Sequence, residues 1–162
     1  MRANLTHDNV AALKMKVEDL RPRSAAWSIR LYEKGGKQHT MPSHHALAEA
    51  LHAYINAAGI AQDRKGWLFR TSSGHNANAL SDQAMDQSAA WRMIRRRAAA
   101  AGIQAPIGNH TFRATGITAY LSNGGALEHA QSMAAHESPR TTKLYDRTKD
   151  RLTQDEVERI RL

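Results

Sequence analysis

Four residues near the C-terminal end of the chain have side chains suited to chemistry on a phosphate group: His110, Arg113, His136 and Tyr145. A guanidinium donates two parallel hydrogen bonds to phosphate oxygens, and an imidazole exchanges a proton near neutral pH. A tyrosine hydroxyl in water titrates near ~10, so it needs a base and positive charge to become a nucleophile. Each residue alone also has a structural interpretation: a helix start, an ion pair, a turn histidine or a half-buried aromatic. The order and spacing of the four residues must therefore distinguish a catalytic role from these structural roles.

The pattern around these residues resembles that of the tyrosine site-specific recombinases, the phage integrase family. Residues 110–113 (His-Thr-Phe-Arg) match the family's His-x-x-Arg motif. Residues 133–138 (Met-Ala-Ala-His-Glu-Ser) stand where the family usually has Leu-Gly-His-x-Ser, and residues 141–145 match Thr-Thr-x-x-Tyr. The arginine and the second histidine are 23 residues apart, and that histidine and the tyrosine nine, which suits the family.

A fourth element lies upstream, in the family's order. Residues 33–37 (Glu-Lys-Gly-Gly-Lys) and Met41-Pro42 resemble a hairpin with Gly-Lys-Gly-x-Lys followed by Val-Pro, in which Lys34 corresponds to the catalytic lysine. One such motif is weak support, whereas four in order at matching intervals identify the chain as similar to the family's catalytic, C-terminal domain.

The resemblance implies DNA recombination or integration by strand cleavage and rejoining through a 3′-phosphotyrosine intermediate, with no cofactor. Tyr145 would attack the phosphorus, while Arg113 and His136 would hold the non-bridging oxygens. His110 is the family's candidate base, and Lys34 would protonate the leaving 5′-oxygen. Fixed cations then supply the charge stabilisation that other nucleases obtain from metal ions.

Charge points to the same partner. Lys and Arg total 23 against 15 acidic residues, a formal net charge of +8, which favours an acidic polymer such as double-stranded DNA. Arg92, Arg95 and Arg96 share one face of a predicted helix, and Lys37 flanks the hairpin turn. We expect these four to contact DNA, although a solvated basic face would show the same pattern.

Metal binding and membrane insertion are not expected. Cysteine is absent, and no histidine pair at metal-ligand spacing stands beside a matched acid. No signal peptide is recognisable, and no segment approaches the roughly 18 apolar residues of a membrane span. The expected location is the cytoplasm. The histidines considered for a metal are His39, His44, His45 and His52.

The elements that must position these residues are mainly helical, with one small antiparallel hairpin, an α+β fold. Alternating apolar residues predict strands over 27–32 and 38–42. Helical spacing and stop signals predict the helices. They span 7–18, 43–58 with Ser43 as N-cap, 81–102, 110–121, 126–135 and 140–145. Residues 61–80 are expected to be mostly loop, and Leu152, Val157 and Ile160 lie in a final amphipathic segment.

The N-terminal region departs from the family. Its other clamp arginine is expected five residues before a leucine, and counting back from Leu13 gives Asp8, which would repel a phosphate. We therefore expect residues 1–162 to form one N-terminally truncated catalytic domain, without the core-binding domain or the first catalytic helices. Two functions stay open: a recombinase, acting as a homo-oligomer that the resemblance makes a tetramer, or an impaired relative that binds DNA or a recombinase.

Overall fold

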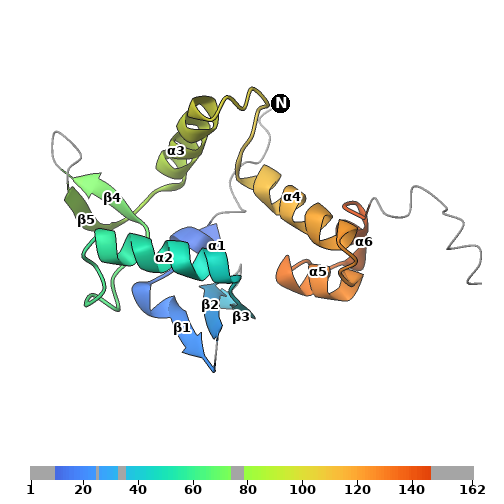
Figure 1. Ribbon diagram of the computed structural model, residues 1–162, viewed down its shortest axis with the longest axis horizontal. Helices are drawn as coiled ribbons and strands as arrows, with labels where there is room; N and C mark the ends of the chain where they lie inside the picture. The colour runs from blue at the N-terminus through green and yellow to red at the C-terminus, as the bar shows by residue number, and fades with distance from the viewer. Residues whose placement is uncertain (1–9, 25, 33–35, 74–78, 147–162) are drawn as a thin grey trace, which may run out of the picture. The chain divides into compact units, whose positions relative to one another are not determined.

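The fold combines α-helices with two small antiparallel sheets (Figure 1), so the predicted α+β class is confirmed. The computed structural model describes residues 10–24, 26–32, 36–73 and 79–146. The chain divides into two compact units, Met1–Asn109 and His110–Leu162. That residues 1–162 form a single catalytic domain stays a prediction.

The first unit contains both sheets. Its elements in chain order are α1 (Val10–Leu13), a 3₁₀ helix η1 (Val17–Asp19), β1 (Leu20–Arg23), β2 (Ala26–Tyr32), β3 (Gln38–Pro42), α2 (His45–Ala57), β4 (Arg70–Ser73), β5 (Ala79–Ala84) and α3 (Gln87–Ala100). One sheet has the order β1-β2-β3 and the other pairs β4 with β5, all antiparallel.

The predicted hairpin is confirmed as β2 and β3. Trp27, Ile29 and Leu31 alternate along β2 and pack against the core, as period-2 patterning requires. The register places Ile29 beside Leu20 on one side and Met41 on the other. Lys34 and Gly35, at the expected turn, lie outside the described residues.

The core of the first unit forms where α2 packs against the three-stranded sheet. Leu51 and Ile55, four residues apart on α2, are buried with Met15 and Leu68. The backbone N–H of Leu68 donates to the carbonyl of Met15 at 2.8 Å, which ties the segment after α2 to the residues between α1 and η1. The N-cap of α2 is His44 and not the predicted Ser43, because Nδ1 of His44 accepts the N–H of Ala46.

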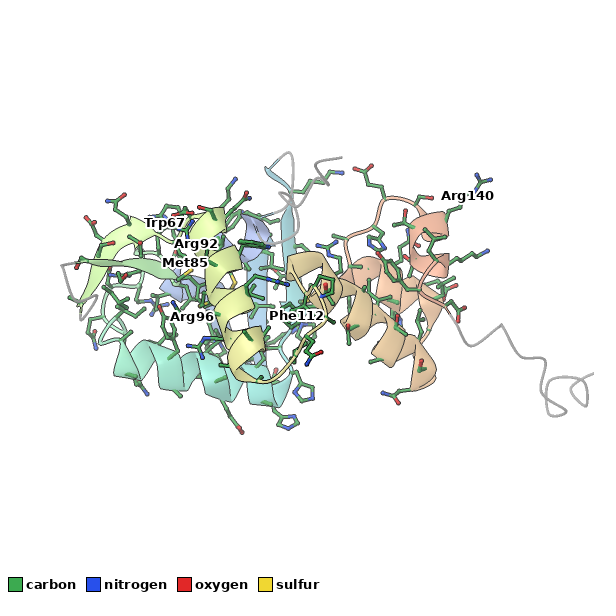
Figure 2. The ribbon with its side chains drawn as sticks, turned by 90° about the horizontal axis from the view of Figure 1, so that it is seen from above. Trp67, Met85, Arg92, Arg96, Phe112 and Arg140 are labelled. Atoms are coloured by element: carbon green, nitrogen blue, oxygen red, sulfur yellow. The ribbon has the colours of Figure 1, made fainter. Side chains whose placement is uncertain are left out.

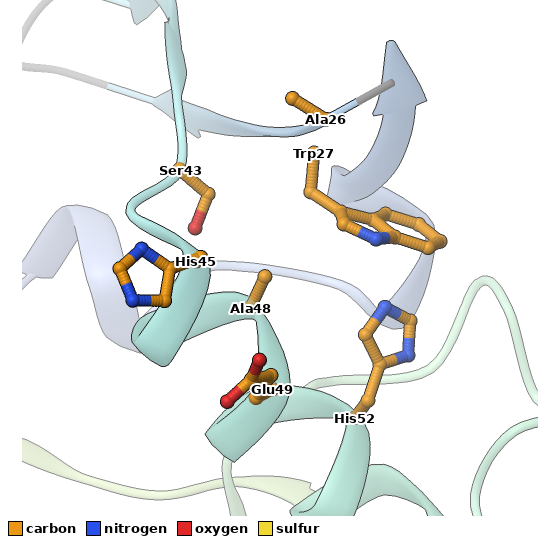
Figure 3. A pocket seen from close by; sticks show the side chains of 7 residues that line it. All are labelled: Ala26, Trp27, Ser43, His45, Ala48, Glu49 and His52. Carbon is orange, nitrogen blue, oxygen red and sulfur yellow. The ribbon is translucent and has the colours of Figure 1, made fainter. Parts of the chain in front are cut away.

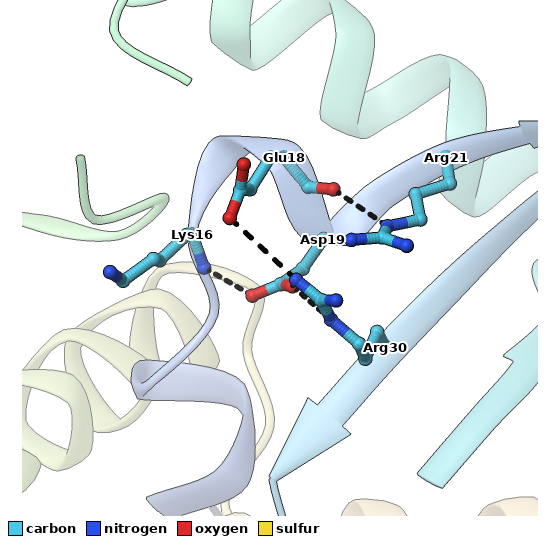
Figure 4. A network of polar contacts seen from close by, with 5 residues as sticks. All are labelled: Lys16, Glu18, Asp19, Arg21 and Arg30. Carbon is cyan, nitrogen blue, oxygen red and sulfur yellow. Dashed lines mark hydrogen bonds and ion pairs between the residues drawn. The ribbon is translucent and has the colours of Figure 1, made fainter. Parts of the chain in front are cut away.

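The predicted helix over 7–18 is wrong beyond its first described turn, because α1 ends at Leu13. A buried carboxylate redirects the chain (Figure 4): Asp19 accepts the backbone N–H of Lys16 at 2.8 Å and Nε of Arg30 on β2 at 2.6 Å. This capping arrangement begins a 3₁₀ turn at Val17 and leads directly into β1.

The predicted helix start at Ser81 is also wrong. Residues 79–84 form β5, where the Ser81 hydroxyl donates to the carbonyl of Thr71 and accepts the N–H of Gln83. Helix α3 begins six residues later, with Asp86 as N-cap accepting the N–H of Ala89 at 2.8 Å. The expected loop over 61–80 also contains β4, which the sequence reading missed.

The second unit is helical in its described part. It contains α4 (Asn109–Ser122), α5 (Leu127–Met133) and α6 (Pro139–Lys143), close to the three predicted helices. Ile117, Leu121, Ala130 and Ala134 form its core. The expected amphipathic segment around 152–160 lies outside the described residues. In the described ranges, no helix is long and apolar enough to cross a membrane.

Candidate active site

The candidate site is built on the turn that ends α5. The N–H of His136 donates to the carbonyl of Gln131 at 3.1 Å, and that of Ala135 to Ser132 at 3.0 Å. This pair of bonds is a Schellman cap, which requires a left-handed residue that is usually glycine. Here Ala135 adopts it, with φ of 49°. The Gln131 side-chain amide also donates to the carbonyl of His136, so the histidine backbone is held from both sides.

The His136 ring is fixed from the next helix. Its Nδ1 lies 2.9 Å from Oγ1 of Thr142, which is 0% exposed. Helix α6 reaches this position because Ser138 caps it, accepting the N–H of Arg140, and Pro139 occupies its first turn. His136 as a whole residue is half-buried.

Arg113 extends from α4 to the same turn. Its Nη1 donates to the carbonyl of Ala134 at 2.8 Å, two residues before His136. No acidic partner of Arg113 occurs among the residues that the structure describes, so the ion-pair interpretation is not supported there. A guanidinium has five N–H donors, and one bond to a carbonyl leaves most of them for an anion.

Tyr145 completes the group. Its ring stacks on that of His136, with centroids 6.0 Å apart and planes 19° from parallel. It also packs against the core of the second unit, and its N–H donates to the carbonyl of Thr142 at 3.0 Å. The structure thus gathers Arg113, His136 and Tyr145 around one turn, although 32 residues separate the first from the last.

The other predicted residues are placed less fully. His110 lies in the first turn of α4, three residues before Arg113, but its side chain is outside the described residues, as are Lys34 and Asp8. Lys37 is exposed beside β3.

The predicted basic face is exposed on α3. Arg92, Arg95 and Arg96 are all accessible, and Figure 2 shows the first and last of them projecting from this helix. The helix is anchored by its acidic N-cap: the Ser88 hydroxyl and the Ala89 N–H hold the pKa of the Asp86 carboxyl below its usual 3.8.

Two polar interactions were not predicted from the sequence: the ion pair between Asp19 and Arg30, and the contact of Thr142 with His136. Burial by itself lowers the pKa of Arg30, but its hydrogen bond and ion pair with Asp19 outweigh that, so the pKa is raised. This pair joins the turn at Asp19 to β2, the first strand of the hairpin. Thr142 was part of the recognised motif, but no role was assigned to it, because burial of one threonine leaves no signal in a single sequence.

A pocket in the first unit is lined by two of the histidines considered for a metal, His45 and His52. It has a volume of about 440 Å³ and lies between the start of β2 and α2 (Figure 3). Trp27 contacts His52 edge to face, with ring centroids 4.2 Å apart, and Glu49 and His45 line the opposite side. Over the described part of the chain, no three His, Cys, Asp or Glu side chains are grouped to hold a metal.

The fold defines the class. A solved structure of XerA recombinase matches with a TM-score of 0.66 and 22% identity, covering 98% of this chain and 54% of that one. The XerH site-specific recombinase, in a post-cleavage complex with a palindromic difH substrate, matches with a TM-score of 0.67 and 20% identity, covering 98% and 40%. The fold is therefore that of a recombinase catalytic domain.

Sequence relatives then give the family. The profile of the phage integrase family matches residues 11–160, and this chain belongs to that family. Tyrosine recombinase XerD of Chlorobaculum tepidum is 30% identical over 119 residues, which are 72% of this chain and 37% of the relative. XerD of Staphylococcus aureus strain Mu50 is 29% identical over 117 residues, or 72% and 38%. The chain thus spans less than two fifths of these relatives.

Proposed function

We propose that this chain cleaves and rejoins double-stranded DNA by site-specific recombination, through attack of the Tyr145 hydroxyl on a phosphodiester. The observation that carries the proposal is the convergence of Arg113, His136 and Tyr145 on the turn after α5. Membership of the phage integrase family and the likeness to XerD tyrosine recombinases support it.

The proposed reaction forms one bond to phosphorus for each one that it breaks, and it needs no cofactor. A Tyr145 oxygen–phosphorus bond forms, the bond from phosphorus to the 5′-oxygen breaks, and a 3′-phosphotyrosine remains. His110 takes the tyrosine proton, and Lys34 gives one to the leaving oxygen. Arg113 and His136 donate hydrogen bonds to the non-bridging oxygens, where negative charge grows in the transition state. A 5′-hydroxyl reverses the sequence to rejoin a strand.

Binding precedes this chemistry. Arg92, Arg95, Arg96 and Lys37 are exposed and contact the DNA backbone in the proposed complex, drawn by a net charge of +8. By family resemblance the active assembly is a homo-oligomer, a tetramer on two duplexes, that works in the cytoplasm.

The test is covalent trapping on a nicked suicide substrate. The wild-type chain should give a slow-migrating, protease-sensitive DNA adduct, and Tyr145→Phe should give none. Tyr120→Phe is the matched control, because Tyr120 packs on the same core and should keep the adduct. An adduct that persists in Tyr145→Phe would refute the mechanism.

Asp8 affects how strong this adduct will be. An acid where a guanidinium is expected should keep the wild-type band faint, since losing one stabilising donor typically costs about 10²–10³ in rate. Asp8→Arg should strengthen the band. If neither protein forms an adduct while both bind DNA, the chain is a DNA-binding or recombinase-interacting module and not a strand-cleaving enzyme.

A further inference from the structure

The buried hydroxyl of Thr142 contacts the ring of His136 and bears on which ring nitrogen carries a hydrogen. We infer that Thr142 is a positioning residue, which holds His136 as the neutral tautomer with its hydrogen on Nε2. The catalytic consequence of this tautomer rests on the proposed function, whereas the tautomer itself does not.

The argument begins with the hydroxyl. Thr142 is fully buried on α6, and its Oγ1 lies 2.9 Å from Nδ1 of His136. Within the described part of the chain, this ring nitrogen is the only side-chain hydrogen-bond partner of Oγ1. A hydroxyl carries one donor hydrogen, and a buried donor without an acceptor is costly.

Only one direction of this hydrogen bond satisfies the hydroxyl. If Nδ1 of His136 carried a hydrogen, it would donate to Oγ1, and the hydroxyl hydrogen of Thr142 would be buried without an acceptor. A doubly protonated ring would create the same conflict. The hydroxyl therefore donates and Nδ1 accepts. A neutral imidazole has a single N–H, so that hydrogen is on Nε2.

The backbone and the ring plane are also restrained. The Schellman cap and the Gln131 amide hold the His136 backbone, and Tyr145 stacks on the ring. The Nε2–H group is consequently a donor of fixed tautomer and fixed direction. In the proposed reaction it donates to a phosphate oxygen without the ring having to be positively charged.

Spectroscopy tests the tautomer directly. In the ¹⁵N-labelled full chain at pH 8, correlations from the ring C–H groups show which nitrogen of each histidine carries hydrogen, and His136→Gln identifies the relevant signals. The wild type and Thr142→Ser should show hydrogen on Nε2. Thr142→Val, which keeps the shape and removes the donor, should show a mixture of both tautomers. Hydrogen on Nδ1 in the wild type would overturn the inference.

Thr141→Val is the matched control for the same substitution. Thr141 is the preceding residue of α6 and is exposed, so its replacement should leave the His136 spectrum unchanged. If Thr142→Val fails to fold, as its thermal unfolding will show, Thr142→Ala gives the same readout. A wild-type spectrum in the folded variant that lacks the hydroxyl would refute the role of Thr142.

Cleavage measures the consequence. Thr142→Val should slow adduct formation about tenfold or more, as loss of a group that orients a site residue commonly does, while Thr142→Ser and Thr141→Val should keep the wild-type rate. If the wild type and Asp8→Arg form no adduct, the proposed function fails and the tautomer result still stands. If Thr142→Val alters the tautomer but cleaves at the wild-type rate, the positioning role is wrong.

Discussion

Replacing Asp19 by asparagine should destabilise the fold by about 3 kcal/mol, at the lower end of the range for breaking a buried ion pair. The carboxylate is 0% exposed, and it accepts from the Lys16 N–H and from Arg30. Asparagine would keep one acceptor but face the guanidinium with an uncharged amide. The lower end applies because Arg30 retains 14% side-chain exposure and has a second carboxylate, Glu18, at 3.7 Å.

The assay is thermal and urea unfolding followed by circular dichroism. At about 2–4 °C per kcal/mol for a chain of this size, the melting temperature should fall by roughly 6–12 °C. Glu18→Gln is the matched control: its longer contact and 30% side-chain exposure limit the expected loss to about 1 kcal/mol or less. The double variant Asp19→Asn/Arg30→Met should be less destabilised than the sum of the two single changes. Equal losses of stability in Asp19→Asn and Glu18→Gln would refute the prediction that the Asp19–Arg30 ion pair stabilises the fold more than the Glu18–Arg30 pair does.

Four further outcomes are expected. Ala135→Gly should raise the unfolding free energy by about 0.5–1 kcal/mol, because glycine relieves the left-handed backbone at φ of 49° but loses more freedom on folding; a decrease in urea midpoint would contradict this. Asp86→Ala should destabilise the protein near neutral pH. The lowered pKa of Asp86 makes its contribution full above the unfolded value of 3.8 and lost as pH falls through the folded value, so the two melting curves should converge in acid. Affinity for duplex DNA should fall linearly with salt on logarithmic axes, and Arg96→Ala should reduce the slope by about 0.9; an unchanged slope would remove this residue from the interface. Lys34→Ala should slow cleavage of an ordinary substrate but spare a 5′-bridging phosphorothiolate, whose leaving group needs no proton; equal slowing of both would exclude Lys34 as the general acid.

The local pattern of apolar residues in the sequence was enough to predict several of the strands and helices. The alternation of Trp27, Ile29 and Leu31 predicted β2, because side chains on a strand point to opposite faces in turn. The helices carrying Arg113 and the region before Tyr145 were predicted within a few residues of their ends. The residues of the proposed site were predicted from the resemblance of their types and intervals to the family's motifs, and their roles stay predictions.

Tertiary structure decided the rest. Strands β4 and β5 are polar and lack alternation, so they are strands only because their backbones pair. The early end of α1 depends on Asp19 reaching an arginine eleven residues away. Thr142 contacts His136 only because α6 packs it out of solvent beside that ring. In each case the deciding interaction joins residues distant in the chain or depends on burial, and neither is encoded in the local periodicity of a sequence.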